Sequence, residues 1–239
     1  MVMSDQLYFR QLLAGRDFAR DDAIAGQMAN FVYAFGDRQS GEAVVVDPAY
    51  RPREILDALS SDAMRVVGVV ATHYHADHVG GRLGGHVIAG LLELLEITDV
   101  PIHVQDDEAS WITGGTTIGD HHLVRHQGGD ELRVGAITAT LLHTPGHSAG
   151  SQCVLVDRRL VSGDTLFLDG CGRTDLPGSD PELMYRTLRE TLSKLDGSTW
   201  LYPGHDYSDR PTAQLDDVRR HNAVLAPLDL AQWLATFTR

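Results

Sequence analysis

The sequence predicts an α/β fold in which helices cover the faces of β-sheets. Short runs of β-branched residues alternate with helical stretches along the chain. Residues 66–72 form a nearly continuous apolar run, as expected of a strand that is buried on both faces. The chain of 239 residues contains neither an internal repeat nor a low-complexity linker. We therefore expect one domain over residues 1–239.

The first half of the chain is predicted to contain two strands and two helices. Residues 42–47 form the first strand, and residues 66–72 form the second. A helix is predicted at 51–61, with Pro52 in its first turn. A second helix is predicted at 86–96, and its apolar face would comprise Val87, Leu91, Leu94 and Leu95. The glycine-rich residues 97–135 are expected to form a long loop.

The second half of the chain is predicted to contain four strands and two helices. The helix at 180–194 is expected to begin at Asp180, whose carboxylate suits the N-cap position. The last helix is predicted at 212–237, with a break at Pro227. The strands are predicted at residues 137–143, 152–156, 159–162 and 199–202.

The charge and composition exclude several classes of function. The formal net charge of −13 at pH 7 would repel phosphate backbones, so nucleic acid is not an expected partner. No apolar run approaches the ~20 residues of a membrane helix, and residues 1–15 lack the pattern of a signal peptide. The cysteines Cys153 and Cys171 cannot form a disulfide framework, which favours a cytoplasmic location.

Potential metal ligands gather at one point of the sequence, directly after the strand at 66–72. They are His73, His75, Asp77 and His78, and Gly80-Gly81 follows them. A loop at the end of a buried strand presents its side chains to a crevice. Imidazole and carboxylate groups are suitable ligands for Zn²⁺ or Fe²⁺, and the lack of thiolates argues against a purely structural zinc site.

Three further candidate ligands follow predicted strands and lie next to glycine. They are His147 in Pro-Gly-His-Ser, Asp164 in Ser-Gly-Asp-Thr and His205 in Pro-Gly-His-Asp. Glycine at such positions allows the backbone to approach a metal closely. A lone histidine in a loop is usually only solvated, but this combination predicts a metal site. The remaining seven histidines are interpreted as surface or core residues: His86, His103, His121, His122, His126, His143 and His221.

These motifs resemble those of the metallo-β-lactamase superfamily over nearly the whole chain. The resemblance implies a four-layer αβ/βα sandwich with the metal site at the strand ends. It implies a first metal position formed by His73, His75 and His147. It implies a second position formed by Asp77, His78 and His205, with Asp164 bridging the two.

Within the superfamily, several segments resemble persulfide dioxygenases. They include Gly41 to Pro48, Gly170-Cys171-Gly172-Arg173-Thr174-Asp175 and His205-Asp206-Tyr207. That resemblance implies a single Fe(II) held by His73, His147 and Asp164, with open positions for O₂ and substrate. Cys171, Arg173 and Tyr207 match residues that line the substrate pocket of that family. The implied substrate is derived from a small thiol, such as a glutathione-type thiol.

Two features point instead to a hydrolase with two zinc ions. The run from Gly172 to Gly178 is also typical of glyoxalase II-like thioesterases, and a lactonase is a further alternative. In addition, 69 positions separate His78 from His147, more than a persulfide dioxygenase would have. The surplus indicates an insertion at about residues 84–130, which would form a wall or lid of the pocket or pack on the sheet. In the hydrolase, Asp164 would hold both metals and Asp77 would orient the nucleophile.

The pocket residues also have plain interpretations. Arg173 could anchor a substrate carboxylate or merely pair with Asp175. The hydroxyl of Tyr207 could reach the metals or pack, and Cys171 could be a small buried hydrophobe, as Cys153 is expected to be. A metal-binding protein without catalysis is disfavoured by the complete ligand set, and a nuclease by the charge. The oligomeric state stays open, a homodimer included.

Overall fold

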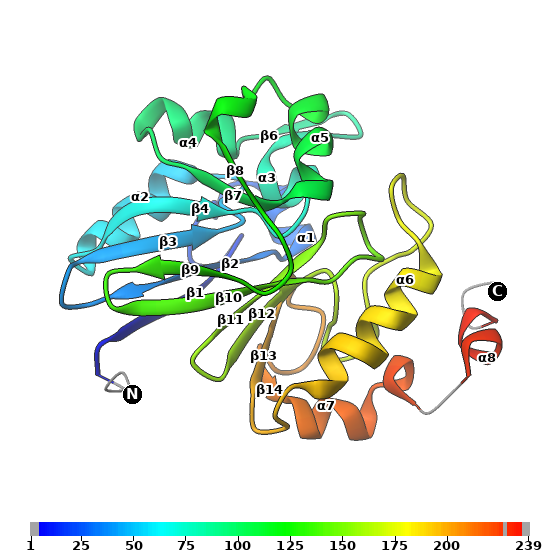
Figure 1. The fold of residues 1–239 in the computed structure, drawn as a ribbon. Helices are drawn as coiled ribbons and strands as arrows, with labels where there is room; N and C mark the ends of the chain where they lie inside the picture. The colour runs from blue at the N-terminus through cyan, green and yellow to red at the C-terminus, as the bar shows by residue number, and fades with distance from the viewer. Residues whose placement is uncertain (1–4, 227–228, 236–239) are drawn as a thin grey trace.

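The computed structural model describes residues 5–226 and 229–235, and it contains two six-stranded sheets that pack face to face (Figure 1). The first sheet has the order β1 (Leu7–Leu13), β2 (Phe31–Asp37), β3 (Glu42–Val46), β4 (Arg65–Val70), β7 (Ile102–Gln105) and β8 (Leu123–His126). The second has the order β14 (Ala213–Gln214), β13 (Trp200–Pro203), β12 (Arg159–Gly163), β11 (Gln152–Val156), β10 (Ile137–His143) and β9 (Asp130–Val134). A separate hairpin pairs β5 (Gly81–Leu83) with β6 (His86–Ile88).

Helices cover the outer face of each sheet. The first sheet carries α1 (Ala23–Met28), α2 (Pro52–Ser61), α4 (Leu91–Ile97) and α5 (Asp106–Gly115), with the single turn α3 (Ala76–Val79) at its edge. The second carries α6 (Pro181–Arg186) and α7 (Leu215–His221), and α8 (Leu230–Leu234) packs against α6. Three apolar clusters separate these layers, one between the sheets and one beneath each helical layer. The arrangement is the predicted four-layer αβ/βα sandwich.

The strand β3 shows how the sequence produces two cores from one sheet. Its side chains alternate, because successive residues of a strand point to opposite faces. Val44 and Val46 pack in the cluster between the sheets, whereas Ala43 and Val45 pack beneath the helices. A strand that is buried on both faces needs a continuous apolar run, and β4 has one for the same reason.

Most of the predicted elements are confirmed within one or two residues. They include the strands at 42–47, 137–143, 152–156, 159–162 and 199–202 and the helix at 51–61. The Asp180 side chain accepts hydrogen bonds from the backbone N–H groups of Glu182 and Leu183, as an N-cap does. The helix after it changes to π geometry at Thr187–Thr191 and to a 3₁₀ turn at Leu192–Lys194.

The predicted helix at 86–96 is partly wrong. Residues His86–Ile88 form strand β6, and helix α4 begins only at Leu91. Gly90 has non-helical backbone angles (φ −168°, ψ −127°), so helix α4 cannot extend back through it. A Cβ at this position would also lie 2.2 Å from the carbonyl oxygen of Val79. Val87 is consequently 69% exposed rather than part of the apolar face.

The long loop predicted at 97–135 is also wrong. This stretch contains β7, α5, a 3₁₀ turn at Asp120–His122, β8 and β9. The four-residue strands are too short for alternation to be visible in the sequence, and the glycine pairs lie at the ends of elements. Residues 84–130 thus supply two strands of the first sheet, and α5 packs on them.

The predicted C-terminal helix at 212–237 is divided into β14, α7, a 3₁₀ turn at Ala223–Leu225 and α8. The predicted break at Pro227 lies outside the described residues. None of the helices in the described ranges is both long and apolar enough to span a membrane.

Candidate metal centre

The histidine cluster follows the C-terminal end of strand β4 in the first sheet. The chain continues from β4 into a loop that carries His73 and His75, and the turn α3 carries Asp77 and His78. His73, Asp77 and His78 are buried, and His75 is half-buried. Because β4 is covered on both faces, its end holds this loop against the core.

The second sheet supplies the other three candidate ligands. Asp164 follows β12 directly, His205 lies two residues beyond β13, and His147 lies in the loop between β10 and β11. β12 and β13 are parallel. β10 runs in the same direction as β12, because β11 is antiparallel to both of them. The ends of these strands therefore meet at one edge, opposite the end of β4.

Glycine makes this convergence possible at two positions. Gly163 has a φ of +47°, and a Cβ there would lie 2.5 Å from the Thr72 hydroxyl. A Cβ on Gly204 would lie 2.4 Å from Oδ1 of Asp164. A larger residue at position 163 would push the two sheet edges apart, and one at position 204 would displace the Asp164 carboxylate.

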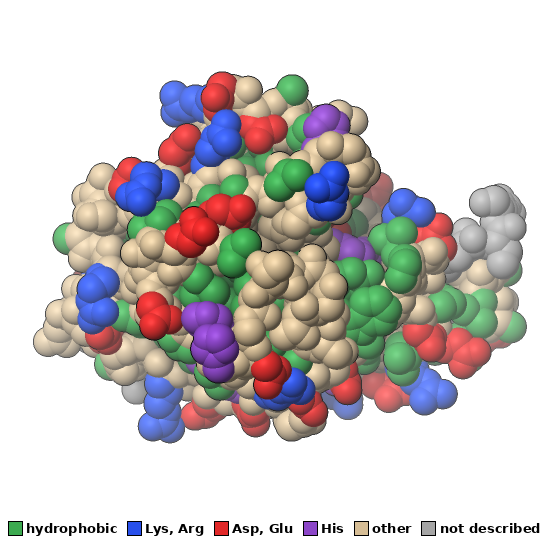
Figure 2. Space-filling view, turned by 90° about the horizontal axis from the view of Figure 1, so that it is seen from above, with side chains coloured by type: hydrophobic (Ala, Val, Ile, Leu, Met, Phe, Trp, Pro, Cys, Tyr) green, Lys and Arg blue, Asp and Glu red, His purple; other side chains and the backbone are tan. Residues whose placement is uncertain are grey.

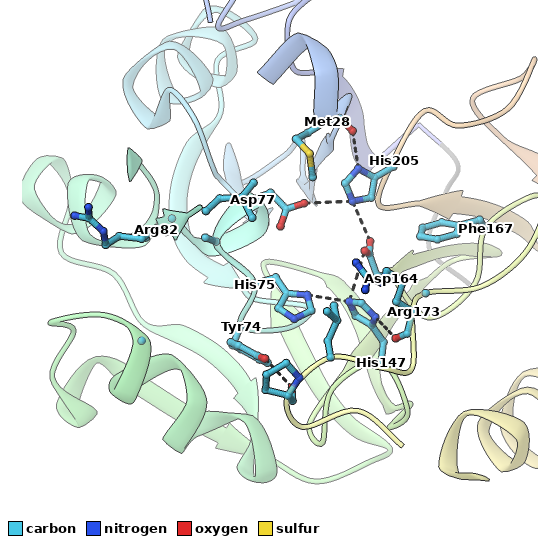
Figure 3. Close-up of a pocket in the computed structure, with 18 of the residues that line it drawn as sticks. Met28, Tyr74, His75, Asp77, Arg82, His147, Asp164, Phe167, Arg173 and His205 are labelled. Atoms are coloured by element: carbon cyan, nitrogen blue, oxygen red, sulfur yellow. Dashed lines mark hydrogen bonds and ion pairs between the residues drawn. The ribbon is translucent and has the colours of Figure 1, made fainter. Parts of the chain in front are cut away.

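Six of the seven candidate ligands form two adjoining groups, and Asp47 forms a further set of potential ligands with His73 and His78. Figure 3 shows the five candidate ligands that face the pocket: His75, Asp77, His147, Asp164 and His205. In the first ligand group, formed by His73, His75 and His147, Nδ1 of His75 lies 3.0 Å from Nε2 of His73 and 2.9 Å from Nε2 of His147. The second ligand group is formed by Asp77, His78 and His205. The potential ligand atoms of each group lie within 4.8 Å of one another.

In the second ligand group, Nε2 of His205 lies 3.3 Å from Nε2 of His78 and 3.4 Å from Oδ2 of Asp77.

Asp164 lies between the two groups. Its Oδ1 is 3.3 Å from Nε2 of His78 and 3.4 Å from Nε2 of His205. Its Oδ2 faces the first group, 3.6 Å from Nε2 of His147. This is the placement that a bridging carboxylate requires.

The protonation states suit a cation at this point. Burial and the imidazoles of His78 and His147 hold the pKa of His73 well below its ordinary value, so its ring is neutral at pH 7. Burial alone would raise the pKa of Asp164, but His205 and His78 hold it well below the ordinary value. Its Oδ1 is buried and has no hydrogen-bond donor among the described residues. Converging lone pairs around a buried carboxylate fit a divalent metal with nitrogen and oxygen ligands.

Each buried histidine is oriented through its other nitrogen. Nδ1 of His147 donates to the carbonyl oxygen of Arg173 at 2.8 Å, and Nδ1 of His205 donates to that of Met28 at 2.7 Å. Nδ1 of His78 donates to Oδ2 of Asp47 at 2.8 Å. With these protons on Nδ1, each neutral ring would turn the lone pair of Nε2 toward the centre. Burial would lower the pKa of His78 and His205, but Asp164 raises both above the ordinary value, so a bound metal would replace a proton on Nε2 of these two rings.

Sequence reasoning assigned no role to Asp47 or Asn30, yet both belong to the site. Asp47 also accepts hydrogen bonds from the backbone and hydroxyl of Thr72, at 2.7 and 2.6 Å. Asn30 is buried, and its Nδ2 lies 3.2 Å from Oδ2 of Asp77 while its Oδ1 accepts from Tyr50. A single polar residue at a strand end produces no sequence pattern, so neither role could be read from this sequence.

A cavity of about 580 Å³ opens beside the ligands. It is lined by five of the candidate ligands and by all three predicted pocket residues, Cys171, Arg173 and Tyr207. The hairpin β5–β6 and helix α5 contribute Leu83 and Gly115 to its wall. The segment 84–130 therefore reaches the pocket, although Leu91 and Leu94 pack in the core under the first sheet.

The three pocket residues differ in their surroundings. Arg173 is 68% exposed in its side chain and pairs with both oxygens of Asp175, at 2.9 and 2.8 Å. Tyr207 stacks on the ring of His205 at 4.6 Å, and partial burial together with Asp164 raises the pKa of Tyr207 to about 12. Burial raises the pKa of the Cys171 thiol to about 12, so this group stays a thiol at pH 7. Cys153 is fully buried, as predicted.

The seven histidines without a predicted metal role stay outside these groups. Within residues 5–226 and 229–235, none of them joins a set of three potential ligands. His103 and His126 pair across β7 and β8 with ring nitrogens 2.9 Å apart, and His121 packs against His122.

The sequence matches the family model described as "Metallo-beta-lactamase superfamily" over residues 26–205. It is 31% identical to human "Persulfide dioxygenase ETHE1, mitochondrial" over 199 residues, which covers 82% of this chain and 71% of the relative. It is 27% identical to "Probable polyketide biosynthesis zinc-dependent hydrolase PksB" of Bacillus subtilis over 209 residues, covering 87% and 86%. The crystal structure of ETHE1 from Myxococcus xanthus superposes with a TM-score of 0.78 at 27% identity, covering 96% of this chain and 89% of that one.

Proposed function

The chain belongs to the metallo-β-lactamase superfamily and is an enzyme of that fold, and within it we propose an iron-dependent dioxygenase that oxidises the persulfide of a small thiol. The observation that carries this proposal is the cavity. Cys171, Arg173 and Tyr207, which match pocket residues of persulfide dioxygenases, line the same cavity as the metal ligands. They come from two separate loops, so their convergence is not a consequence of sequence proximity alone.

In this proposal His73, His147 and Asp164 hold the iron. Bound there, Fe(II) would supply open coordination positions for O₂ and for the substrate sulfur. Arg173 fixes the imidazole of His147 through its backbone carbonyl, so the pocket loop and the metal ligand are positioned together. The reaction converts R–S–SH, O₂ and water into R–SH, sulfite and two protons. The sulfur–sulfur bond breaks, the terminal sulfur is oxidised and O₂ is reduced.

The pocket residues bind the substrate rather than attack it. Because Cys171 stays protonated, it can pack against or hydrogen-bond the substrate sulfur but is a poor nucleophile. The protonated hydroxyl of Tyr207 is available as a hydrogen-bond donor. Met28, Phe167 and Leu176 form an apolar part of the wall that suits the carbon chain of a thiol.

Arg173 is the candidate anchor for a carboxylate of the substrate. It is engaged with Asp175, so a substrate carboxylate would have to replace that partner. The pair is exposed to solvent, which screens its attraction, so a substrate carboxylate can replace Asp175 as the partner of Arg173. We expect Arg173→Ala to raise KM more than it lowers kcat, because an anchor acts equally in ground and transition states.

A hydrolase with two zinc ions is the second candidate, and one observation favours it. The second ligand group is complete, and Asp164 lies between the two groups. Two bound zinc ions would supply a hydroxide nucleophile at neutral pH for cleavage of a thioester or lactone. Asp77 would then orient the nucleophile, and Asn30 would hold Asp77 in place.

An oxygen electrode decides between the two candidates. Iron-loaded protein is expected to consume O₂ when given glutathione persulfide and to release sulfite. The metal-free protein is the control. Absence of O₂ uptake above that control, together with cleavage of a thioester or lactone by the zinc form, would establish the hydrolase instead.

The variant Asp77→Ala provides an independent comparison. In the dioxygenase it should leave one iron bound, because Asp77 belongs to the second ligand group. In the hydrolase it should remove one of two metal equivalents. Metal content of the purified variant, measured beside the wild type, reads out this difference without any substrate.

A further inference from the structure

Glu108 is a buried carboxylate that the proposed chemistry does not use. It lies in the first turn of α5 and is fully buried. Among the described residues, no lysine, arginine or histidine pairs with it within ion-pair distance. Burial of such a group is costly unless hydrogen bonds satisfy it.

Hydrogen bonds from two loops satisfy both oxygens of Glu108. Oε1 accepts from the backbone N–H of Tyr74 at 2.7 Å, and Oε2 accepts from that of Gly150 at 2.7 Å. The Ser148 hydroxyl lies 2.8 and 2.9 Å from the two oxygens. The carboxylate therefore joins residues that are far apart in the sequence and belong to different sheets.

Both loops carry ligands of the first group. Tyr74 stands between His73 and His75, and Ser148 directly follows His147. A shift of either loop would change the spacing of these three imidazoles. One side chain on α5 thus spans the two halves of the first metal position.

Helix α5 also contacts the aromatic ring of Tyr74. Trp111, one turn after Glu108, stacks on the Tyr74 ring with centroids 4.9 Å apart. The Tyr74 hydroxyl donates to the carbonyl oxygen of Pro177 at 2.7 Å (Figure 3). Pro177 belongs to the loop whose Arg173 carbonyl accepts from His147, which completes a ring of contacts around the first ligand group.

We propose that Glu108 is a positioning residue for the first metal position. It sets the distance between the loop of His73 and His75 and the loop of His147. The second ligand group is positioned by other contacts, those of Asp47, Asn30 and Met28. The inference rests on the metal centre and holds for the dioxygenase and the hydrolase alike.

Zinc affinity of the metal-free protein, measured by competition with a chromogenic chelator, tests this role. Glu108→Ala is expected to weaken one metal equivalent by about 10- to 100-fold, the usual cost of losing a group that orients metal ligands. Glu108→Gln should have a smaller effect. The amide oxygen could still accept a hydrogen bond from one loop, whereas the amide nitrogen would face the backbone N–H donor of the other loop.

Ile112→Ala is the matched control, because Ile112 is equally buried on the same helix and its apolar side chain donates no hydrogen bond to either loop. It should lower the melting temperature but leave zinc affinity unchanged. If Glu108→Ala does not fold, Ser148→Ala replaces it and should weaken zinc binding several-fold. Wild-type zinc affinity in a folded Glu108 variant, or equal weakening by Ile112→Ala, would overturn the proposal. Neither result depends on which reaction the enzyme catalyses.

Discussion

Asp164 is the residue on which the metal centre depends most. Its two oxygens face different ligand groups, and its buried Oδ1 has no hydrogen-bond donor within the described ranges. Residue types and spacing were enough to predict this aspartate and the six other candidate ligands. They were not enough for Asp47, Asn30 or Glu108. Their contacts join positions 31 to 47 residues apart and leave no local pattern.

Replacement of Asp164 by asparagine is expected to abolish activity and to lower metal content. The substitution keeps the size of the side chain but removes the negative charge between two groups of neutral or cationic imidazoles. The loss of metal affinity should exceed the roughly 100-fold that removal of an orienting partner costs. Elemental analysis of the purified variant provides the measurement. Asp57→Asn, at an exposed position of α2, is the control. Normal metal content in Asp164→Asn would contradict the assignment.

At the scale of elements, the paired strands β7 and β8 were not recognised in the sequence, because four-residue strands with histidine in them show no clear alternation. Their pairing places His103 against His126 on adjacent strands, with Asp130 3.4 Å from the far nitrogen of His126. The strands β3 and β4 were predicted, since burial on both faces dictates their composition. The strands β1 and β2 were not predicted, although β2 is buried along its whole length.

The pair on β7 and β8 makes stability depend on pH. Burial, and then His126, lowers the pKa of His103 to about 4. In the unfolded chain the ordinary pKa is about 6.5, so the unfolded state binds the proton first as the pH falls. The contribution of His103 to the free energy of unfolding is therefore fully present above about pH 6.5 and is lost as the pH falls from about 6.5 to 4.

Metal-free His103→Gln should accordingly lose less stability than the metal-free wild type over this pH range, by up to roughly 3 kcal/mol. Urea unfolding at several pH values measures the difference. His86→Gln is the control, because His86 is exposed. Parallel pH profiles for wild type and His103→Gln would show that His103 does not titrate with folding.

At the scale of the whole molecule, the metal centre is where the two halves of the sandwich meet. The loop after β4 and the turn α3 contribute four candidate ligands, and the loops of the second sheet contribute three. The order of strands and the facing of the sheets depend on contacts between distant segments. They followed from the family resemblance and not from local pattern. Acidic and basic side chains are interspersed over the surface seen in Figure 2.

Because ligands from both sheets converge, a bound metal should stabilise the whole fold. Ligand at 1,000 times its Kd stabilises by about 4 kcal/mol, which for a chain of this size corresponds to roughly 10 °C in Tm. Removal of metal with a chelator should therefore lower Tm, and added metal should restore it. Asp164→Asn should show a much smaller shift. Coincident melting curves with and without metal would mean that the halves are not linked in this way.

If the seven side chains form a metal centre, activity should depend on the metal that they hold. The most direct test is the metal content of protein expressed with iron or with zinc, paired with the activity of each form and of the metal-free protein. We expect at least one tightly bound equivalent, no activity without metal, and O₂ uptake with glutathione persulfide in the iron form. Protein that retains no metal, or that is equally active after metal removal, would contradict the account.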